Sequence, residues 1–247
     1  MCPYKNRELP ISVNTKLAAL IGWPLGHSAS AEMHNDAYAA MGLDAIYLPL
    51  PVEPQNAAEA VKAMETMGFM GCNVTIPHKV AVKELMDELH PSAAESGAVN
   101  TVLFKEGRRI GYNTDGTGFV HALIEKGGFH PSGKSCLMIG AGGAARGVAS
   151  ALAISGAAKF LIANRAEEYE MAERLADDMN ALRPGSARPL VLDKKGVGGA
   201  RGCRTLDGMW MLVYQGAEAV RIWTGMEPPV DVMAAGCERF LEDLQKH

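Results

Sequence analysis

The chain has 247 residues, of which 48% are hydrophobic and 21% charged, the composition of an ordinary globular protein with room for one large or two modest domains. A formal net charge of −4 gives it no basic field for nucleic acid, and no uninterrupted apolar run reaches the length of a membrane span. The five scattered cysteines lack the spacing of a metal or redox site, and residues 1–10 lack the apolar core of a signal peptide, so we expect reduced thiols, no metal and a cytoplasmic protein.

The first predicted strand, residues 17–21, is a short apolar run that leads into a loop rich in glycine, proline and serine. A helix is predicted over residues 31–41. Ser30 stands where it can cap that helix, but Ser28 and Ser30 together can instead face an anion such as a carboxylate. The spacing favours neither interpretation over the other.

The segment at residues 73–79 reads Asn-Val-Thr-Ile-Pro-His-Lys and has the alternation of a half-buried strand, which should stop at Pro77. The ends of strands are where α/β folds place their chemistry, so the crowding of Asn73, Thr75 and Lys79 at one strand end favours a site over a solvated lysine. The other elements predicted in this part of the chain are strands at residues 45–50 and 98–103 and helices at residues 54–67 and 80–89.

A hairpin turn is predicted at residues 107–109, and the strand that follows it ends at Asp115, before another helix. Asn113 or Thr114 can cap that helix, and Asp115 in its first turn has the common role of favouring the helix dipole. The strand ends of this half together carry serine, asparagine, threonine, lysine and aspartate side chains, which suit a small, polyhydroxylated, anionic ligand.

A nucleotide-binding pattern follows the apolar strand predicted at residues 135–139. Residues 140–145 read Gly-Ala-Gly-Gly-Ala-Ala and precede a predicted helix at residues 146–155, which gives G-x-G-x-x-A between a strand and a helix. The first glycine permits the tight turn, the second lets the backbone approach a pyrophosphate, and the helix N-terminus attracts its charge. The expected cofactor-binding residues are Gly140, Ala141, Gly142, Gly143 and Ala144.

The next predicted strand, residues 160–163, ends in Asn164 and Arg165. An NAD site usually has a carboxylate there for the ribose 2′-hydroxyl, whereas a guanidinium suits a 2′-phosphate. We therefore expect NADP as the cofactor, with NAD as the alternative. The remaining elements predicted are helices at residues 166–182, 209–223 and 230–244 and a strand at residues 189–192.

Five blocks in this order resemble the shikimate dehydrogenase family, including its quinate/shikimate and shikimate-dehydrogenase-like branches. They are residues 22–35, 73–79, 98–101, 111–118 and 140–146, and a sixth lies at residues 207–216. The resemblance implies an α/β fold with an N-terminal substrate domain, a Rossmann-type dinucleotide-binding domain and a cleft between them. It places the substrate domain in residues 1–115 and 209–247 and the NADP domain in residues 116–208.

The resemblance also implies roles for particular residues. Lys79 and Asp115 would form the catalytic acid–base pair, and Ser28 and Ser30 would bind the substrate carboxylate. The ring hydroxyls would be held by Asn73, Thr75, Asn100, Asp115 and Gln215. The implied reaction is the reversible, NADP-dependent reduction of 3-dehydroshikimate to shikimate in aromatic amino acid biosynthesis, by a monomer or homodimer. The alternatives are a quinate or aminoshikimate-type substrate, NAD as cofactor, or a non-catalytic ligand-binding relative.

The chain departs from the family pattern in four places. Ala31 replaces a usual proline, Ala166 and Tyr169 thin the expected clamp for the 2′-phosphate, and Trp210 stands where glycine is usual beside the substrate. The largest departure follows residue 193, where two family blocks are missing and about 40–50 residues, more than one βαβ unit, are absent. The glycine-rich residues 196–202 lack the flanking elements of a second phosphate loop.

Overall fold

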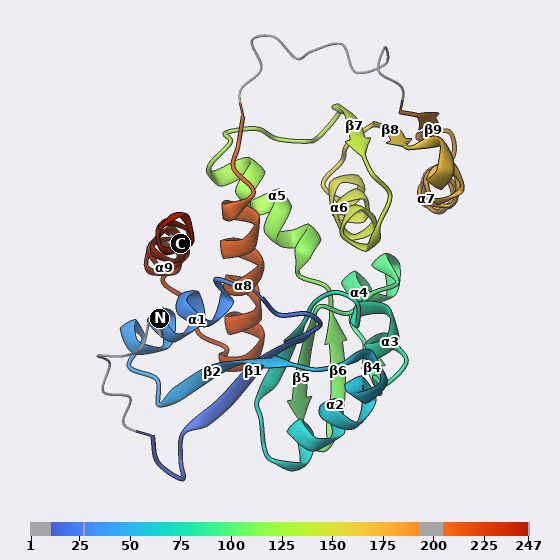
Figure 1. Ribbon diagram of the computed structural model, residues 1–247. Helices are drawn as coiled ribbons and strands as arrows, with labels where there is room; N and C mark the ends of the chain where they lie inside the picture. Colours follow the sequence, from blue (N-terminus) through green and yellow to red (C-terminus); the bar gives the residue numbers. More distant parts are fainter. Residues whose placement is uncertain (1–10, 27, 193–204, 247) are drawn as a thin grey trace.

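Two β-sheets organise the protein. The computed structural model describes residues 11–26, 28–192 and 205–246, and in these ranges one sheet has six strands and the other three (Figure 1). Helices cover both faces of the larger sheet, which confirms the predicted α/β fold. None of the helices in these ranges is long and apolar enough to cross a membrane. The same ranges contain no group of three His, Cys, Asp or Glu side chains placed to hold a metal ion.

The larger sheet is mixed, with the order β2-β1-β3-β5-β6-β4. β1 runs parallel to β2 and β3, whereas β5 is antiparallel to both β3 and β6. The β5–β6 hairpin turns at Glu106 and Gly107, which both have positive φ, as a tight hairpin turn requires. The strands are β1 (Lys16–Gly22), β2 (Ala45–Pro51), β3 (Gly71–Val74), β4 (Glu88–Leu89), β5 (Thr101–Lys105) and β6 (Arg108–Tyr112).

β1 is apolar after the exposed Lys16, and both of its faces are buried from Ala18 onward. Ala18 and Leu20 point to a core shared with α1, α8 and α9, and Ala19 and Ile21 point to a second core beneath α2, α3 and α4. Helices from distant parts of the sequence meet on the first face, where α1 and α9 lie side by side (Figure 1). These helices are α1 (Ser30–Ala40), α2 (Ala57–Thr66), α3 (Lys79–Lys83), α4 (Pro91–Ser96), α8 (Met209–Thr224) and α9 (Val230–Gln245).

The smaller sheet consists of three parallel strands in the order β7-β8-β9. Met138 and Ile162 point toward the covering helices and form a third core with them. On the opposite face, Leu137 and Ile139 remain 51% and 60% exposed. The elements are β7 (Ser135–Ile139), α6 (Gly143–Ile154), β8 (Lys159–Asn164), α7 (Tyr169–Leu182) and β9 (Ala187–Val191). The described part of the chain thus has three strands where a dinucleotide-binding sheet usually has six, and one face of this sheet is open.

Helix α5 (Asp115–Glu125) connects the two parts of the molecule, because it packs against α8 on one side and α6 on the other (Figure 1). Two glycines allow both approaches. A Cβ on Gly118 would lie 2.5 Å from the backbone nitrogen of Gln215 in α8, and a Cβ on Gly116 would lie 2.3 Å from the carbonyl oxygen of Gly147 in α6. The start of α5 therefore lies between the helix that carries Gln215 and the helix that follows the glycine-rich loop.

The periodicity located most elements within a few residues, but it was wrong over residues 80–89. The helix α3 ends at Lys83, and Leu89 lies in β4, where it pairs with Gly111 of β6. The short helix α4 was not predicted. The glycine-rich residues 196–202, and the expected gap near residue 193, lie outside the described residues.

Candidate active site

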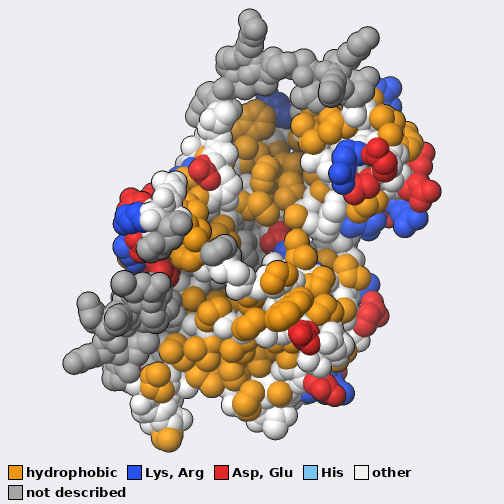
Figure 2. Space-filling model, viewed as in Figure 1, with side chains coloured by type: hydrophobic (Ala, Val, Ile, Leu, Met, Phe, Trp, Pro, Cys, Tyr) orange, Lys and Arg blue, Asp and Glu red, His pale blue; other side chains and the backbone are white. Residues whose placement is uncertain are grey.

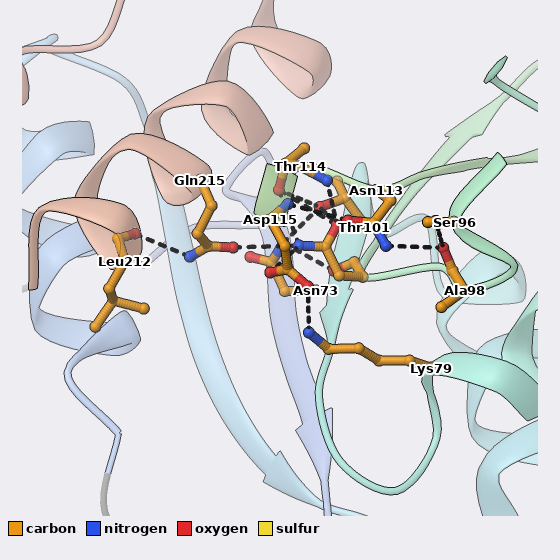
Figure 3. Close-up of polar contacts among 11 residues, drawn as sticks. Asn73, Lys79, Ser96, Ala98, Thr101, Asn113, Thr114, Asp115, Leu212 and Gln215 are labelled. Carbon is orange, nitrogen blue, oxygen red and sulfur yellow. Dashed lines mark hydrogen bonds and ion pairs between the residues drawn. The ribbon is translucent and has the colours of Figure 1, made fainter. Parts of the chain in front are cut away.

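Lys79 and Asp115 are 36 residues apart in the chain and meet above one end of the larger sheet. Lys79 Nζ lies 2.6 Å from Asp115 Oδ2, and their side chains are only 19% and 9% exposed (Figure 3). Lys79 is the first residue of α3 and Asp115 the first of α5. The Pro77 break after β3 and the end of the β5–β6 hairpin bring these two helix starts together.

The other carboxylate oxygen of Asp115 is held by Asn100. Asn100 Nδ2 donates to Asp115 Oδ1 at 2.8 Å, and Asn113 Oδ1 accepts the backbone N–H of Asp115 at 3.1 Å. The capping position of α5 belongs to Thr114, but no side chain among the described residues caps this helix, so the side-chain cap expected from Asn113 or Thr114 is absent. The Asn113 bond instead closes the turn that leads into α5. Because Oδ1 is engaged, Oδ2 is the oxygen that faces Lys79, and the carboxylate has one fixed orientation.

Buried hydroxyl groups complete the support of Asn100. Its Oδ1 accepts from the Thr114 backbone N–H at 2.8 Å and from Thr101 Oγ1 at 3.0 Å, and Nδ2 also donates to Thr114 Oγ1 at 3.0 Å. Asn100, Thr101 and Thr114 are all buried. The Asn100 side chain thus orients Asp115 and the start of α5.

Asn73 lies in the same network, at the end of β3. Its Nδ2 donates to the carbonyl oxygen of Asn100 at 3.2 Å and to Thr101 Oγ1 at 2.9 Å, and its Oδ1 accepts from the hydroxyl of Tyr47 at 2.8 Å. Both N–H groups of the Asn73 amide are therefore already engaged. Only the second lone pair of Oδ1 remains for a ligand.

The two serines of the first loop do not cap α1. The capping position belongs to Ala29, no side chain caps this helix, and Ser30 is its first residue. Ser28 Oγ instead accepts the backbone N–H of Ser30 at 3.3 Å. The helix-cap interpretation of Ser30 is therefore wrong.

All eight residues expected for catalysis and substrate binding line one cavity of about 800 Å³, which opens beside the larger sheet. Figure 2 shows hydrophobic side chains around a hollow in the molecule, with acidic and basic groups at its base. Gln215 reaches the cavity from α8, where its Nε2 donates to the Leu212 carbonyl oxygen at 3.0 Å. The eight residues are Ser28, Ser30, Asn73, Thr75, Lys79, Asn100, Asp115 and Gln215.

The apolar side of the cavity comes from the loop after β1 and from α8 and α9. Leu25, Met209 and Phe240 are among its lining residues, but Trp210 is not. The indole of Trp210 lies instead against α5, with Lys126 Nζ 4.0 Å from its ring centroid. Trp210, which stands at the position expected beside the substrate, is therefore not part of the wall of this cavity.

Burial changes the titration of several groups near the site. Burial lowers the pKa of His34 to about 4, although the carbonyl groups of Ser30 and Gly216 act in the opposite direction, so the ring is neutral at neutral pH. Burial also raises the pKa of Tyr47 well above its ordinary value, an effect that the neighbouring Ser30 side chain opposes. Burial raises the pKa of the Cys72 thiol to about 12, so it stays protonated beside the site.

The glycine-rich loop before α6 fits a pyrophosphate. Gly140 has a φ of +97°, and a Cβ added at Gly142 or Gly143 would meet no atom within 4 Å. Because α6 begins at Gly143, the first-turn N–H groups of this helix open onto that free space. Ala145 packs against the core beneath the loop, as the pattern predicts.

Asn164 and Arg165, the two cofactor-binding residues expected at the end of β8, already have partners within the protein. Asn164 Oδ1 accepts the backbone N–H of Arg165, and its Nδ2 donates to the Glu168 carbonyl oxygen, so this amide organises the turn before α7. Arg165 Nη2 lies 2.6 Å from Glu168 Oε1 on the surface. A carboxylate thus stands beside the guanidinium expected to bind a 2′-phosphate, and the sequence pattern alone did not reveal it.

Sequence reasoning missed the buried residues that support the site. Thr101 follows Asn100 in the chain and Thr114 precedes Asp115. A hydroxyl residue next to an expected site residue was therefore a usable signal. Tyr47 gave no such signal, because an aromatic residue within an apolar strand is an ordinary core residue. Its contact with Asn73 depends on the order of the strands, which places β1 between β2 and β3.

Comparison with known proteins agrees with this geometry. The chain matches the family "Shikimate dehydrogenase substrate binding domain" over residues 20–102 and the family "Shikimate 5'-dehydrogenase C-terminal domain" over residues 208–235. A shikimate dehydrogenase (NADP(+)) of Citrifermentans bemidjiense is 38% identical over 276 positions, covering 91% of this chain and 95% of the relative. About 225 residues of this chain take part in that alignment, so about 50 positions have no counterpart here.

Solved structures share the fold. Shikimate 5-dehydrogenase from Listeria monocytogenes, in complex with shikimate and NAD, has a TM-score of 0.83 and 30% identity and covers 92% of this chain and 97% of its own. The ligand-free 5-ketofructose reductase of a Gluconobacter strain has a TM-score of 0.82 and 32% identity, with coverage of 92% and 99%. The sequence identity over nearly the whole length of these relatives, together with the paired Lys79 and Asp115, shows that the chain belongs to the shikimate dehydrogenase family.

Proposed function

We propose that this protein catalyses the reversible, NADP-dependent reduction of 3-dehydroshikimate to shikimate. The observation that carries the proposal is the Lys79–Asp115 pair, 2.6 Å apart in a cavity that also holds the serine, threonine and amide groups suited to a hydroxylated carboxylate. The curated relatives named shikimate dehydrogenase (NADP(+)) support the same activity.

The pair can move the proton that the reaction needs. A ketone that accepts a hydride develops the charge of an alkoxide and must receive a proton. Lys79 Nζ carries three N–H donors, of which one faces Asp115, so the other two are available to the substrate oxygen. In the reduction, Lys79 donates its proton to that oxygen; in the oxidation, the pair takes the hydroxyl proton back. The Asp115 carboxylate keeps the ammonium in place.

The remaining polar groups of the cavity orient the substrate. Ser28 and Ser30 would bind the carboxylate, and Asn73, Thr75, Asn100, Asp115 and Gln215 the ring hydroxyls. Asn73 can only accept a hydrogen bond from the substrate, since both of its N–H groups are engaged within the protein. This fixed polarity favours a hydroxyl group over a carbonyl at the ring position that faces Asn73.

The loop 140–144 would hold the pyrophosphate, with Asn164 and Arg165 beside the adenosine ribose. When bound, the dinucleotide supplies or accepts the hydride at the ring carbon. The open space before Gly142 and Gly143 suits the phosphate groups. We propose that residues 116–208 form this nucleotide-binding unit, of which residues 193–204 lie outside the described ranges. Residues 1–115 and 209–247 would form the substrate-binding unit, in a cytoplasmic monomer or homodimer.

The absorbance of NADPH at 340 nm tests the proposal. We expect NADP reduction with shikimate, and slower reduction with quinate or with NAD. Faster turnover of quinate, or oxidation of NADPH by 5-ketofructose only, would contradict the proposed substrate. Shikimate binding in calorimetry without turnover under any cofactor would identify a non-catalytic relative, for which the three-stranded nucleotide sheet provides a structural reason.

Glu168→Gln is expected to lower the KM for NADP about two- to fivefold. The change removes the charge that engages Arg165 and competes with a 2′-phosphate for the guanidinium, while the loss of an exposed ion pair costs at most about 1 kcal/mol of stability. The ratio of kcat/KM for NADP to that for NAD should rise by the same factor.

Glu170→Gln is the matched control, because Glu170 also forms an exposed ion pair, with Arg174 one helical turn away. It should leave both cofactor KM values unchanged. Equal effects of the two substitutions would show that Glu168 acts only through general surface charge.

A further inference from the structure

Tyr47 contacts the expected substrate-binding residues without reaching the cavity. It is 1% exposed and does not line the pocket. Its hydroxyl donates to Asn73 Oδ1 at 2.8 Å. Its ring stacks on His34 with a centroid separation of 4.0 Å and an interplanar angle of 11°, and His34 Nδ1 lies 2.8 Å from the Ser30 carbonyl oxygen. One buried side chain thus connects the residues expected at the hydroxyl end and at the carboxylate end of the substrate.

The direction of the Tyr47–Asn73 hydrogen bond follows from the other partners of Asn73. The carbonyl oxygen of Asn100 can only accept, so the amide nitrogen of Asn73 must face it. The amide oxygen then faces Tyr47, and the phenol must donate. Without that donor, the amide oxygen loses the bond that holds it in place, because Asn100 and Thr101 contact only the amide nitrogen.

The backbone of Tyr47 is held independently of its hydroxyl. Asn35 Nδ2 donates to the Tyr47 carbonyl oxygen at 3.0 Å, and Asn35 Oδ1 accepts the Tyr47 N–H at 2.8 Å. Removal of the hydroxyl therefore leaves the ring where it stacks on His34. This separation makes Tyr47→Phe a test of the hydroxyl and not of the ring.

We propose that Tyr47 is a positioning residue of the substrate site, whose hydroxyl holds the amide oxygen of Asn73 in place to accept a hydrogen bond from one hydroxyl of the substrate. This inference rests on the proposed function, since it assumes a ring hydroxyl at Asn73. It assigns no contact between Tyr47 and the substrate. It predicts that the effect of Tyr47 depends on whether the ligand carries ring hydroxyls.

The experiment compares Tyr47→Phe with Tyr38→Phe. Tyr38 is equally buried in the same core, but its hydroxyl has no hydrogen-bond partner among the described residues. We expect Tyr47→Phe to raise the KM and the calorimetric Kd for shikimate about tenfold, the usual consequence of losing one buried hydrogen bond, with kcat within about twofold. Tyr38→Phe should leave all three unchanged.

A second ligand separates positioning from general structure. Cyclohexene-1-carboxylate keeps the carboxylate and lacks the ring hydroxyls, so its inhibition constant should be the same in wild type and Tyr47→Phe. In an Asn73→Ala background, Tyr47→Phe should have no further effect on shikimate affinity. An equal loss for both ligands, an effect that persists without Asn73, or a Tyr47→Phe protein that does not fold would overturn the inference.

The two proposals fail in different ways. Wild type that binds shikimate without turning it over contradicts the proposed function, while the Kd ratio of Tyr47→Phe to wild type still decides the inference. Wild type that oxidises shikimate, with Tyr47→Phe indistinguishable from Tyr38→Phe, contradicts the inference alone. Wild type that binds no shikimate overturns both.

Discussion

Lys79→Ala is expected to lower kcat for shikimate oxidation about 10²–10⁴-fold, the range that a general acid or base contributes. The KM for shikimate should stay within a few-fold, because the cavity retains seven of its eight expected ligand-binding residues. The change removes the ammonium group that lies 2.6 Å from Asp115 Oδ2 and leaves a carboxylate that only Asn100 supports. Steady-state rates at 340 nm with saturating NADP measure both constants.

Lys83→Ala provides the matched control. Lys83 ends the same short helix, pairs with Glu84 on the surface and does not line the cavity. Its kcat should equal that of wild type. A Lys79→Ala protein with unchanged turnover would remove Lys79 from the mechanism and with it the assignment of the acid–base pair.

Gly118→Ala is expected to lower both stability and substrate affinity, because α5 and α8 have no room for a methyl group between them. The added Cβ would lie 2.5 Å from the backbone nitrogen and 2.8 Å from the Cα of Gln215, and backbone cannot move aside as a flexible side chain can. Overpacking of this kind typically costs about 1–3 kcal/mol, or roughly 2–12 °C in Tm for a chain of this size.

Because the displaced backbone carries Gln215, the KM for shikimate should rise with the loss of stability. Thr117→Ala, at the neighbouring half-buried position of the same helix, removes atoms and favours helix, so its Tm should stay close to that of wild type. Thermal unfolding and steady-state kinetics check both variants. A Gly118→Ala protein with wild-type Tm would show that the two helices are farther apart than described.

The smaller sheet raises a separate question about how a nucleotide is held. Dinucleotide-binding sheets normally have six strands, with the ligand across the point where the strand order reverses. The described residues contain three such strands. β7 lies at one edge of this sheet and exposes Leu137 and Ile139. The glycine-rich loop at the end of β7 is nevertheless complete. The described residues therefore include the loop that would bind the phosphates, but only part of the sheet that usually contacts the rest of the cofactor.

Much of the architecture was predictable because local patterns report local structure. The strand before Pro77 and the glycine-rich turn at residues 140–145 were both predicted, and both are present. The strand ends at Val74 and all four of its residues are buried, so the half-buried alternation expected over residues 73–76 was wrong. The helix predicted over residues 80–89 was wrong because Leu89 is half-buried in a strand that pairs with β6, where its partner is Gly111. The spacing of apolar residues over a short segment does not distinguish a helix packed on a core from a strand paired in a sheet.

The sequence by itself determined which chemical groups are present and which elements carry them: a lysine and an aspartate at helix starts, amides and hydroxyls at strand ends, and a phosphate-binding turn. Only the tertiary structure decided their partners. The strand order placed Tyr47 beside Asn73, and the short turn before α7 placed Glu168 beside Arg165. The packing of α8 on α5 kept Trp210 out of the wall of the cavity. The physical reason is that hydrogen bonds and ion pairs act over a few ångströms in space, whereas the residues they join are set side by side only when the sheet assembles and its helices pack.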